Sequence, residues 1–297
     1  MSTLLQPYNE RMMEVLLYIQ RNLDGDLSPE TLAEQACFSV AHFHRIFKGM
    51  IGESLKEHVR RLRLERGAYR LCYTDKSVMN IALDAGFESP ETFSRAFKKR
   101  FLVPPSDFRN SSRAIVSPGN DGKIHYRPEP STNNFQLDES PAKNKVEIRT
   151  RKETQVVFIR HVGPYLDVTK AWAKLCGWGF GKGLMSYQTE FIGLCYDDPD
   201  ITPTEKIRYD ACFSIDNEVE TPPGMGIQFI PGGKYAVTTH YGDYEGLHDA
   251  YRELYGKWLP TSGYQLKNNI PSFEKYIKAP PDVPPEKAVT ELWLAIY

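Results

Sequence analysis

The sequence predicts two structural parts, an all-α part followed by an α+β part. Apolar residues recur at helical spacing up to about residue 110. From about residue 145, short β-branched and aromatic runs alternate with two helical stretches. In addition, each part contains an internal repeat. A chain of 297 residues is long enough for about two domains.

Composition and charge argue against several protein classes. No apolar run approaches the roughly 20 residues of a membrane-spanning helix, and no signal peptide is recognisable. The five cysteines contain no C-x-x-C pair, so we expect a cytoplasmic protein with no disulfide, metal or cofactor. Residues 1–113 hold 17 Lys and Arg against 14 Asp and Glu, a net charge of +3; since the whole chain carries -1, the remainder carries -4. This asymmetry fits a nucleic-acid-binding segment joined to another function.

The first part is predicted to be a series of helices. An apolar face predicts a helix over residues 8–23, and Ser28-Pro29 predicts the start of the next one. Pro104-Pro105 end the series before a last short helix. The further helices are expected at residues 40–48, 54–73, 78–85, 90–100 and 106–110.

A short motif occurs twice in this part. The stretch CFSVAHFHRIFK (37–48) has a close copy in GFESPETFSRAFK (86–98), and both contain S-x-x-x-F-x-R-x-F-K. Each copy predicts a helix, a tight turn at a small residue (Cys37 or Gly86) and a second helix. This is the helix-turn-helix arrangement, whose second helix lies in the major groove of DNA. The helix between the copies spans about 30 Å, close to the roughly 34–36 Å between successive major-groove faces.

The side chains of the two copies divide into core and exposed sets. The phenylalanines are expected in the core, whereas Arg45 and Arg95 are expected on the exposed faces, where Arg can pair with guanine. Ala41, His42 and His44, and in the second copy Glu91, Thr92 and Ser94, are expected beside them. Lys98-Lys99-Arg100 and the arginines of helix 54–73 suit phosphate contacts. The alternative is an all-helical domain with arginines on solvated faces, but the duplication favours DNA.

The second part has a repeat of its own. HVGPYLDVTKAWAKLCG (161–177) aligns without a gap with HYGDYEGLHDAYRELYG (240–256). Two such units predict one α+β domain with pseudo-two-fold symmetry. The matching positions of His161 and His240 suggest a structural role, so neither is proposed as a metal ligand. A proline-rich linker is expected at 113–144, and strands at 146–148, 155–160, 191–195, 209–215, 227–230, 235–240, 273–277 and 290–297.

Residues 8–110 resemble the DNA-binding domain of AraC/XylS-type transcription regulators. The resemblance rests on ACFSVAHFHRIFK, the long helix, IALDAGFESPETFSRAFKKRF and VPPSDFR. It implies that residues 1–112 form a double helix-turn-helix domain that binds double-stranded DNA and works with RNA polymerase. Relatives often have Trp at the position of Ala41 and Gln at that of His44. The residues implied to bind DNA are Ser39, Ala41, His44, Arg45, Pro90, Glu91, Thr92, Ser94, Arg95 and Lys99.

Residues 145–297 resemble the GyrI-like effector domain. The resemblance rests on the internal repeat of this part, on GLCYDDPDITPTEKIRYDACF (193–213), and on PSFEKYI (271–277) followed by the terminal strand. It implies a small-molecule effector and a pocket lined by Glu274, the Glu of the F-E-x-Y string. A carboxylate among aromatic rings would favour a lipophilic cation. The aromatic candidates for this pocket are Trp172, Tyr187, Trp258 and Trp293.

Three alternatives stay open at this point. Glu274 could be an exposed strand carboxylate paired with a lysine. The second part could be a protein-interaction module, or it could hydrolyse a reactive small molecule with Glu274 and Tyr276, which would share one strand face. We expect a regulator rather than an enzyme, because the second part is fused to a DNA-binding part.

Overall fold

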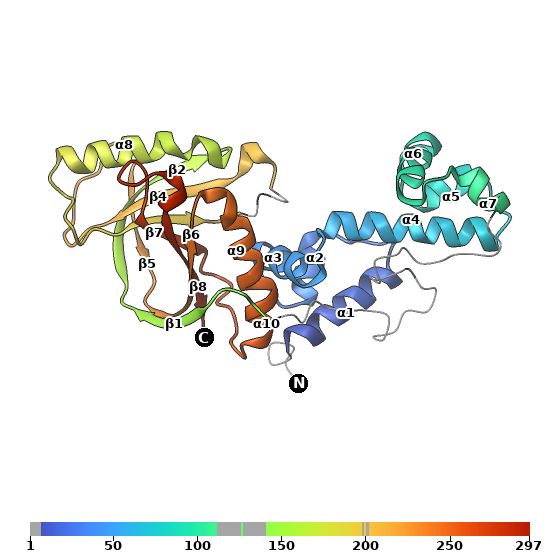
Figure 1. The fold of residues 1–297 in the computed structure, drawn as a ribbon, viewed down its shortest axis with the longest axis horizontal. Coiled ribbons are helices and arrows are strands. Elements are labelled where there is room, and N and C mark those ends of the chain that lie inside the picture. Colours follow the sequence, from blue (N-terminus) through green and yellow to red (C-terminus); the bar gives the residue numbers. More distant parts are fainter. Residues whose placement is uncertain (1–6, 112–125, 127–140, 198, 200–201) are drawn as a thin grey trace. The chain divides into compact units, whose positions relative to one another are not determined.

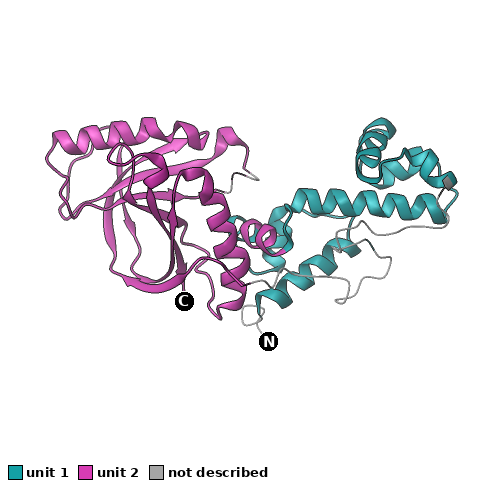
Figure 2. Cartoon of the chain, viewed as in Figure 1, with its two compact units in different colours: residues 1–43, 51–138 teal, residues 44–50, 139–297 magenta. Residues whose placement is uncertain are grey.

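The computed structural model describes residues 7–111, 126, 141–197, 199 and 202–297 (Figure 1). The chain divides into two compact units (Figure 2). Unit 1 comprises residues 1–43 and 51–138, and unit 2 comprises residues 44–50 and 139–297. Most of the linker predicted at 113–144 lies outside the described residues. None of the described helices is long and apolar enough to cross a membrane.

The helices of the first part occur where the sequence predicts them. Serine side chains begin several of them: Ser28, Ser54, Ser77 and Ser89 each accept a hydrogen bond from the backbone N–H three residues further on. All of these helices belong to unit 1, except that residues 44–50 of α3 belong to unit 2. The helices are α1 (Tyr8–Arg21), α2 (Pro29–Gln35), α3 (Val40–Ile51), α4 (Leu55–Tyr73), α5 (Val78–Asp84), α6 (Pro90–Phe101) and α7 (Pro105–Ser111).

The two predicted turns have the same backbone structure. Cys37 and Gly86 both adopt the left-handed conformation, with φ of 53° and 72°. After α2, the N–H groups of Cys37 and Phe38 donate to the carbonyls of Glu34 and Ala33, at 3.0 and 2.9 Å. After α5, Gly86 and Phe87 make the same two hydrogen bonds, to Leu83 and Ala82, at 2.9 and 3.1 Å. Both helices therefore end in a Schellman motif, and the sequence duplication is a duplication of backbone geometry.

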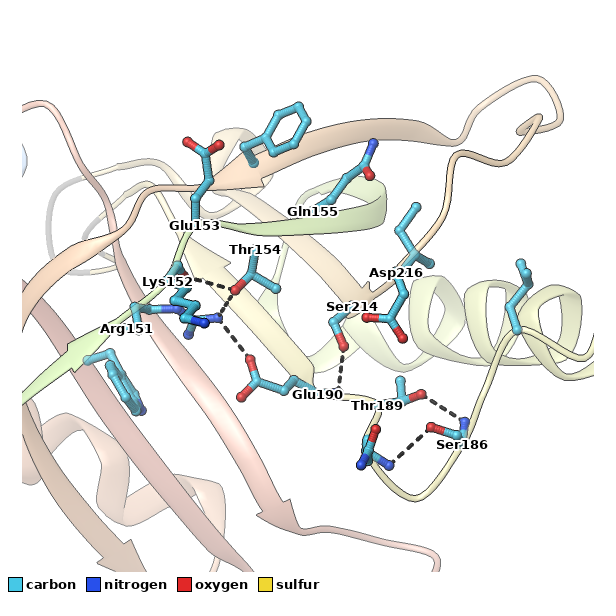
Figure 3. Close-up of a pocket in the computed structure, with 15 residues that line it drawn as sticks. Arg151, Lys152, Glu153, Thr154, Gln155, Ser186, Thr189, Glu190, Ser214 and Asp216 are labelled. Atoms are coloured by element: carbon cyan, nitrogen blue, oxygen red, sulfur yellow. Dashed lines mark hydrogen bonds and ion pairs between the residues drawn. The ribbon is translucent and has the colours of Figure 1, made fainter.

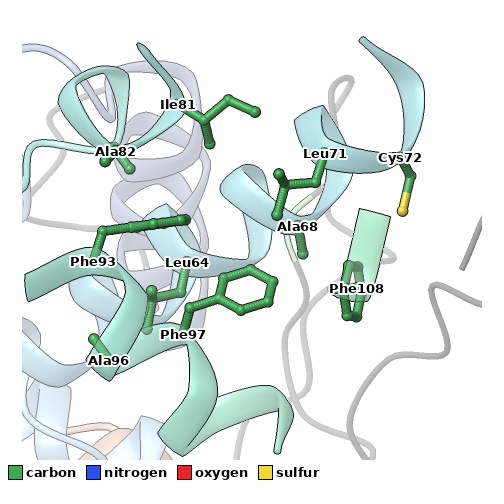
Figure 4. Packing of buried hydrophobic residues seen from close by; sticks show 11 residues of the cluster. Leu64, Ala68, Leu71, Cys72, Ile81, Ala82, Phe93, Ala96, Phe97 and Phe108 are labelled. Carbon is green, nitrogen blue, oxygen red and sulfur yellow. The ribbon is translucent and has the colours of Figure 1, made fainter. Parts of the chain in front are cut away.

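The second helix pair packs on α4. Phe93 and Phe97 of α6 are fully buried and lie against Leu64, Ala68 and Leu71 of α4 (Figure 4). The ring centroids of Phe93 and Phe97 are 5.4 Å apart. Burying an aromatic side chain of this kind contributes about 1.5–3 kcal/mol. These phenylalanines form the core, as the spacing of the motif predicts.

Unit 2 is built on one curled antiparallel sheet with two helical stretches beside it (Figure 1). Its eight strands follow the order β1-β6-β8-β7-β3-β4-β2-β5. The helices are α8 (Val168–Gly181), α9 (Leu247–Glu253) and α10 (Leu259–Thr261), and a π-helical turn (Leu254–Trp258) connects the last two. The strands are β1 (Val146–Arg151), β2 (Thr154–Val162), β3 (Phe191–Cys195), β4 (Arg208–Ser214), β5 (Gly226–Ile230), β6 (Gly233–Tyr241), β7 (Ser272–Lys278) and β8 (Val289–Ile296).

The sheet has the pseudo-two-fold symmetry that the repeat predicts. The alignment that places His161 on His240 continues along the chain and makes β2 equivalent to β6, β3 to β7 and β4 to β8. In the sheet, equivalent strands lie at equal distances from the β3–β7 boundary, on opposite sides of it. Leu194 and Phe273 are equivalent positions in this alignment and are also opposite each other in the β3–β7 ladder. The pseudo-two-fold axis therefore passes through this pair. Each half contributes its first strand to the other half: β1 pairs with β6, and β5 pairs with β2.

The two turns predict opposite effects of substitution on stability. Gly86→Ala should lower the free energy of unfolding by about 1–2 kcal/mol, because an L-residue is disfavoured at positive φ. A Cβ at Gly86 would also lie 3.0 Å from Nη1 of Arg63. Cys37→Gly should raise the free energy of unfolding, because it relieves the same strain in the first copy. Urea denaturation of both variants tests this; equal signs for the two would contradict the assigned turn geometry.

Candidate functional site

A buried carboxylate lies at the centre of unit 2. Glu274 is 8% exposed and projects from β7. The hydroxyl of Tyr276 donates to its Oε2 at 2.6 Å, and the hydroxyl of Tyr251 on α9 donates to its Oε1 at 3.4 Å. The thiol of Cys195 on β3 lies 3.5 Å from Oε1. Glu274 is therefore not the exposed, lysine-paired carboxylate of the first alternative.

Aromatic side chains surround this carboxylate. The hydroxyls of Tyr209 and Tyr276 are 2.7 Å apart, and Nε1 of Trp172 on α8 donates to Tyr209 at 3.1 Å. The rings of Trp172 and Tyr244 are both edge-on to Tyr276, with centroids 5.5 and 5.8 Å away. Tyr165 makes an edge contact with Tyr209 at 5.9 Å. We call Glu274, Tyr276, Tyr251, Tyr209, Trp172, Tyr165, Tyr244 and Cys195 the Glu274 cluster.

The fold explains why these side chains meet. Strand alternation places Ser272, Glu274 and Tyr276 on one face of β7. Gly193 is opposite Glu274 in the ladder, and a Cβ there would lie 2.2 Å from the hydroxyl of Tyr209. The absence of a side chain at Gly193 thus lets Tyr209 reach across β3 to Tyr276.

The Glu274 cluster is arranged about the pseudo-two-fold axis. Three of its pairs are equivalent positions of the two halves: Tyr165 with Tyr244, Trp172 with Tyr251, and Cys195 with Glu274. The two halves therefore supply matching aromatic residues to one place. They differ in charge, because the carboxylate occurs in the second half alone and a thiol takes its position in the first.

Burial sets the electrostatics of the Glu274 cluster. Burial raises the pKa of Glu274, while hydrogen bonds from Tyr276 and Cys195 and the charge of Arg45 oppose that rise. Burial also raises the pKa values of Tyr209, Tyr251 and Tyr276, so these hydroxyls remain protonated donors. An ionised Glu274 is costly in this environment, and a cation beside it would reduce that cost.

The structure brings together two of the five predicted ligand residues, Glu274 and Trp172. Tyr187 is 96% exposed and belongs to a loop, so its predicted place in the site is wrong. Trp258 stacks on Tyr264 with centroids 6.1 Å apart, in the π-helical turn, and does not join the Glu274 cluster. Trp293 is opposite Phe273 in the β7–β8 ladder, on the sheet face away from Glu274.

Trp293 instead lines a polar hollow of about 600 Å³ (Figure 3). Arg151 forms part of this hollow and donates to Glu190 and Thr154, at 2.8 Å in each case. The guanidinium of Arg151 also lies 5.2 Å from the ring centroid of Phe273 and 5.4 Å from that of Trp293. Trp293 therefore packs against an internal arginine, which accounts for its aromatic character without a ligand.

Helix α6 presents the predicted DNA-contacting residues of the second copy. Glu91, Arg95 and Lys99 are exposed, and Pro90 and Ser94 are half-buried. Thr92 has a structural use, because its hydroxyl and backbone N–H form the capping box with Ser89. The exposed face of α6 is thus charged and free of large apolar side chains.

Helix α3 differs from its copy. Ser39 accepts a hydrogen bond from the N–H of His42 at 3.4 Å, and Ala41 is half-buried. His42 and His44 are 4% and 6% exposed, so their predicted exposure is wrong. The predicted exposure of Arg45 is also wrong, because residues 44–50 pack within unit 2. There Nη1 of Arg45 donates to Ser272 Oγ at 2.5 Å and Nη2 to the carbonyl of Asp197 at 3.2 Å.

Most arginines of α4 make contacts inside the protein, so their predicted role in phosphate binding needs correction. Arg61 pairs with Glu53 and Glu65, Arg66 with Asp24, and Arg70 with Asp84. Arg63 donates to the carbonyl of Leu23. Burial opposes the shift at Glu53, but hydrogen bonds from His58 and Arg61 lower its pKa to about 2. Arg60 stays exposed on this helix.

Sequence reasoning missed Tyr251, Tyr209, Tyr165 and Tyr244 as members of the Glu274 cluster. The signal was available, because Tyr165/Tyr244 and Trp172/Tyr251 are matched positions of the repeat. Residues related by a two-fold axis meet where they are close to that axis. His161 and His240, matched in the same way, each contact the carbonyl three residues on, at 2.9 and 2.7 Å, which is the structural role expected.

Comparisons with known proteins agree with both parts. Residues 144–296 match the family described as GyrI-like small molecule binding domain, and residues 32–111 match a helix-turn-helix domain. The chain is 36% identical over 110 residues to the uncharacterized HTH-type transcriptional regulator YbfP of Bacillus subtilis (strain 168), covering 37% of each chain. It is 36% identical over 99 residues to the transcriptional regulator Rob of Salmonella typhimurium, covering 33% of this chain and 34% of Rob. The matches thus span about a third of these relatives. The EcmrR C-terminal domain structure has a TM-score of 0.44 at 19% identity, over 52% of this chain and 98% of that one.

The raised pKa of Glu274 predicts a pH-dependent stability. In the unfolded chain this carboxyl titrates near 4.5, and in the folded chain at a higher pH. Between these values the folded state holds more protons, so stability falls as pH rises. Glu274→Gln should remove this contribution. The unfolding temperature should therefore fall more between pH 5 and pH 8 in the wild type than in the variant, measured by scanning calorimetry. Parallel profiles would contradict the assigned burial of the charge.

Proposed function

Because the chain belongs to the GyrI-like small molecule binding family and carries an AraC-type helix-turn-helix segment, we propose that it is a transcription regulator with an effector site. In this proposal residues 1–112 bind double-stranded DNA, 113–144 form a linker and 145–297 bind a small amphipathic cation. The observation that carries the proposal is a single buried carboxylate, Glu274, among matched aromatic residues on a pseudo-two-fold axis.

Charge and shape of the Glu274 cluster support a cationic effector. A cation beside the carboxylate offsets the cost of burying that charge. In this proposal the rings of Trp172, Tyr244 and Tyr276 contribute cation–π attraction of about 0.5–2 kcal/mol each. An anion would meet Glu274 with the same sign of charge, and a neutral compound would add no charge that stabilises the ionised carboxylate.

The DNA-binding proposal rests on the duplicated turn and on the exposed face of α6. Arg95, Lys98 and Lys99 are exposed on α6; in the proposal Arg95 contacts a base and the two lysines contact phosphates. The other residues proposed for base contacts in this copy are Pro90, Glu91, Thr92 and Ser94. In α3 the proposed residues are Ser39, Ala41, His44 and Arg45, of which His44 and Arg45 would contact DNA only after release from their packing within unit 2. A chain that regulates bacterial transcription in this way would act in the cytoplasm, with RNA polymerase as a further partner.

Turnover of the bound compound is a second candidate function. The hydrogen bond of 2.6 Å between Tyr276 and Glu274 joins the two groups that a hydrolytic site of this kind would use. Product formation that Glu274→Gln abolishes would establish it. Fusion to a DNA-binding segment makes sensing the better-supported function.

The effector proposal predicts selective binding of a lipophilic cation. Tetraphenylphosphonium should bind the full chain, and Glu274→Gln should weaken this binding by roughly 2–3 kcal/mol, because the attraction between two unit charges about 6–8 Å apart is lost. Tetraphenylborate has the same shape and the opposite charge, so it is the matched control and should not bind. Isothermal titration calorimetry measures all three cases. Equal binding of both ions would show that binding depends on apolar contact alone and would overturn the proposal.

The DNA-binding proposal predicts that one substitution reduces sequence preference and another reduces affinity for all DNA. Arg95→Ala should cost about 1–3 kcal/mol on a selected site and reduce the preference for it over other DNA. Lys99→Ala should weaken binding to all sequences about equally and reduce the slope of log K against log salt by about one unit. Fluorescence anisotropy on DNA selected from a random library, at several salt concentrations, measures both. Unchanged sequence preference in Arg95→Ala would exclude a specific base contact by Arg95.

A further inference from the structure

Unit 2 contains a second recognition element, next to the Glu274 cluster, that holds a guanidinium group. Nη1 of Arg45 donates to Ser272 Oγ at 2.5 Å and to Tyr255 Oη at 3.3 Å, and Nη2 donates to the Asp197 carbonyl at 3.2 Å. The guanidinium carbon lies 4.8 Å from the ring centroid of Tyr251 and 5.4 Å from that of Tyr255. Two rings and three oxygens thus match a flat, multiply donating cation.

This guanidinium site is continuous with the Glu274 cluster. Tyr251 faces Arg45 with its ring and donates its hydroxyl to Glu274. Ser272 and Glu274 share one face of β7. The carbonyl of Asp197 accepts from Tyr165 of the Glu274 cluster as well as from Arg45. A ligand that combines an aromatic group with a guanidinium could therefore occupy both places.

The backbone around Arg45 is shaped for this engagement. A Cβ on Gly49 would lie 2.3 Å from the Cα of Gly256, and a Cβ on Gly256 would lie 2.2 Å from the Cα of Gly49. Only two glycines allow the main chains to approach this closely. Gly256 lies in the π-helical turn that follows α9, whereas its repeat partner Gly177 lies in the regular helix α8 with open space around it. The two halves of unit 2 thus differ where residues 44–50 pack.

We propose that Tyr251, Tyr255, Ser272 and the Asp197 carbonyl form a guanidinium-binding site that Arg45 occupies as an internal ligand and that an aromatic guanidinium compound takes over by displacing Arg45. The proposal rests on the proposed function for its consequence. Arg45 is one of the residues proposed to contact DNA, and it cannot donate to a base while its nitrogens donate to Ser272 and Asp197. Displacement therefore makes Arg45 available to DNA. By linkage, DNA that engages Arg45 must tighten binding of the compound by the same factor.

Phenylguanidine is the probe, and its binding to the full chain is measured by isothermal titration calorimetry. An internal ligand lowers the apparent affinity of a competitor by the fraction of time it occupies the site. Arg45→Ala should therefore bind phenylguanidine at least about fivefold more tightly than the wild type. Arg95→Ala removes the equivalent arginine of the exposed copy and should bind as the wild type does. Adding Ser272→Ala to Arg45→Ala should remove most of the gain.

A second pair of variants leaves Arg45 in place. Gly256→Ala introduces a methyl group where Gly49 packs, so it should expel residues 44–50 and raise phenylguanidine affinity as Arg45→Ala does. Gly177→Ala makes the same change at the repeat partner, where space is open, and should leave the affinity unchanged. Thermal unfolding of each variant confirms that it is folded. If neither Arg45→Ala nor Gly256→Ala gains affinity, Arg45 is not an internal ligand and the proposal is wrong.

The two proposals fail in distinguishable ways. If neither variant gains affinity for phenylguanidine but tetraphenylphosphonium still binds, the guanidinium site is overturned and the effector site stands. If both sites are confirmed, phenylguanidine should increase the affinity of the wild type for a selected DNA several-fold. It should leave the DNA affinity of Arg45→Ala unchanged. An equal increase in Arg45→Ala would overturn the displacement of Arg45 as the cause. If no DNA bound under any condition, the proposed function would fail and the calorimetric result would still decide the guanidinium site.

Discussion

The pseudo-two-fold axis through the Leu194–Phe273 pair is the constraint on which unit 2 depends. Antiparallel pairing of β3 with β7 fixes that pair, and the flanking repeat partners Cys195 and Glu274 then lie in contact. The axis brings Cys195 against Glu274 and the helices α8 and α9 to one face of the sheet. The charge of Glu274, next to this pair, is consequently buried, and its surroundings are aromatic because both halves supply aromatic residues.

Unit 1 uses duplication in a different way. Its two copies keep the backbone of the turn, down to the same pair of hydrogen bonds, although one turn has Gly and the other Cys at positive φ. Left-handed Cys costs about 1–2 kcal/mol, which the packed helices on each side must offset. The phenylalanines, the arginine and the lysine of the motif are kept, while the positions between them differ between copies. Conservation of the scaffold with divergence of the surface is what two separate contacts with one DNA would require.

The periodic features could be predicted from the sequence, and the contacts between distant segments could not. The helices, the strands and the two-fold arrangement all follow from spacing, because repeats and apolar periodicity report local structure. Glu274 and Trp172 were found, since a lone carboxylate in an aromatic string and a repeat helix are visible in the chain. Tyr187, Trp258 and Trp293 were wrong because aromatic content alone does not tell which face of a strand or which loop a residue occupies. The burial of His44 and the engagement of Arg45 depend on a Gly49–Gly256 approach between residues far apart in the sequence, which no local pattern reports.

The contacts of Arg45 also set the size of any switch built on them. Three of its acceptors among the described residues are neutral oxygens, and hydrogen bonds from a charged donor contribute about 1.5–3 kcal/mol each at most. A bidentate contact with guanine contributes about 1–3 kcal/mol of discrimination. Three such hydrogen bonds together exceed one contact with guanine, so DNA by itself does not withdraw Arg45 from these acceptors. A compound that donates to the same oxygens competes with Arg45 directly, and the population of Arg45 that it releases depends on the difference between the two affinities.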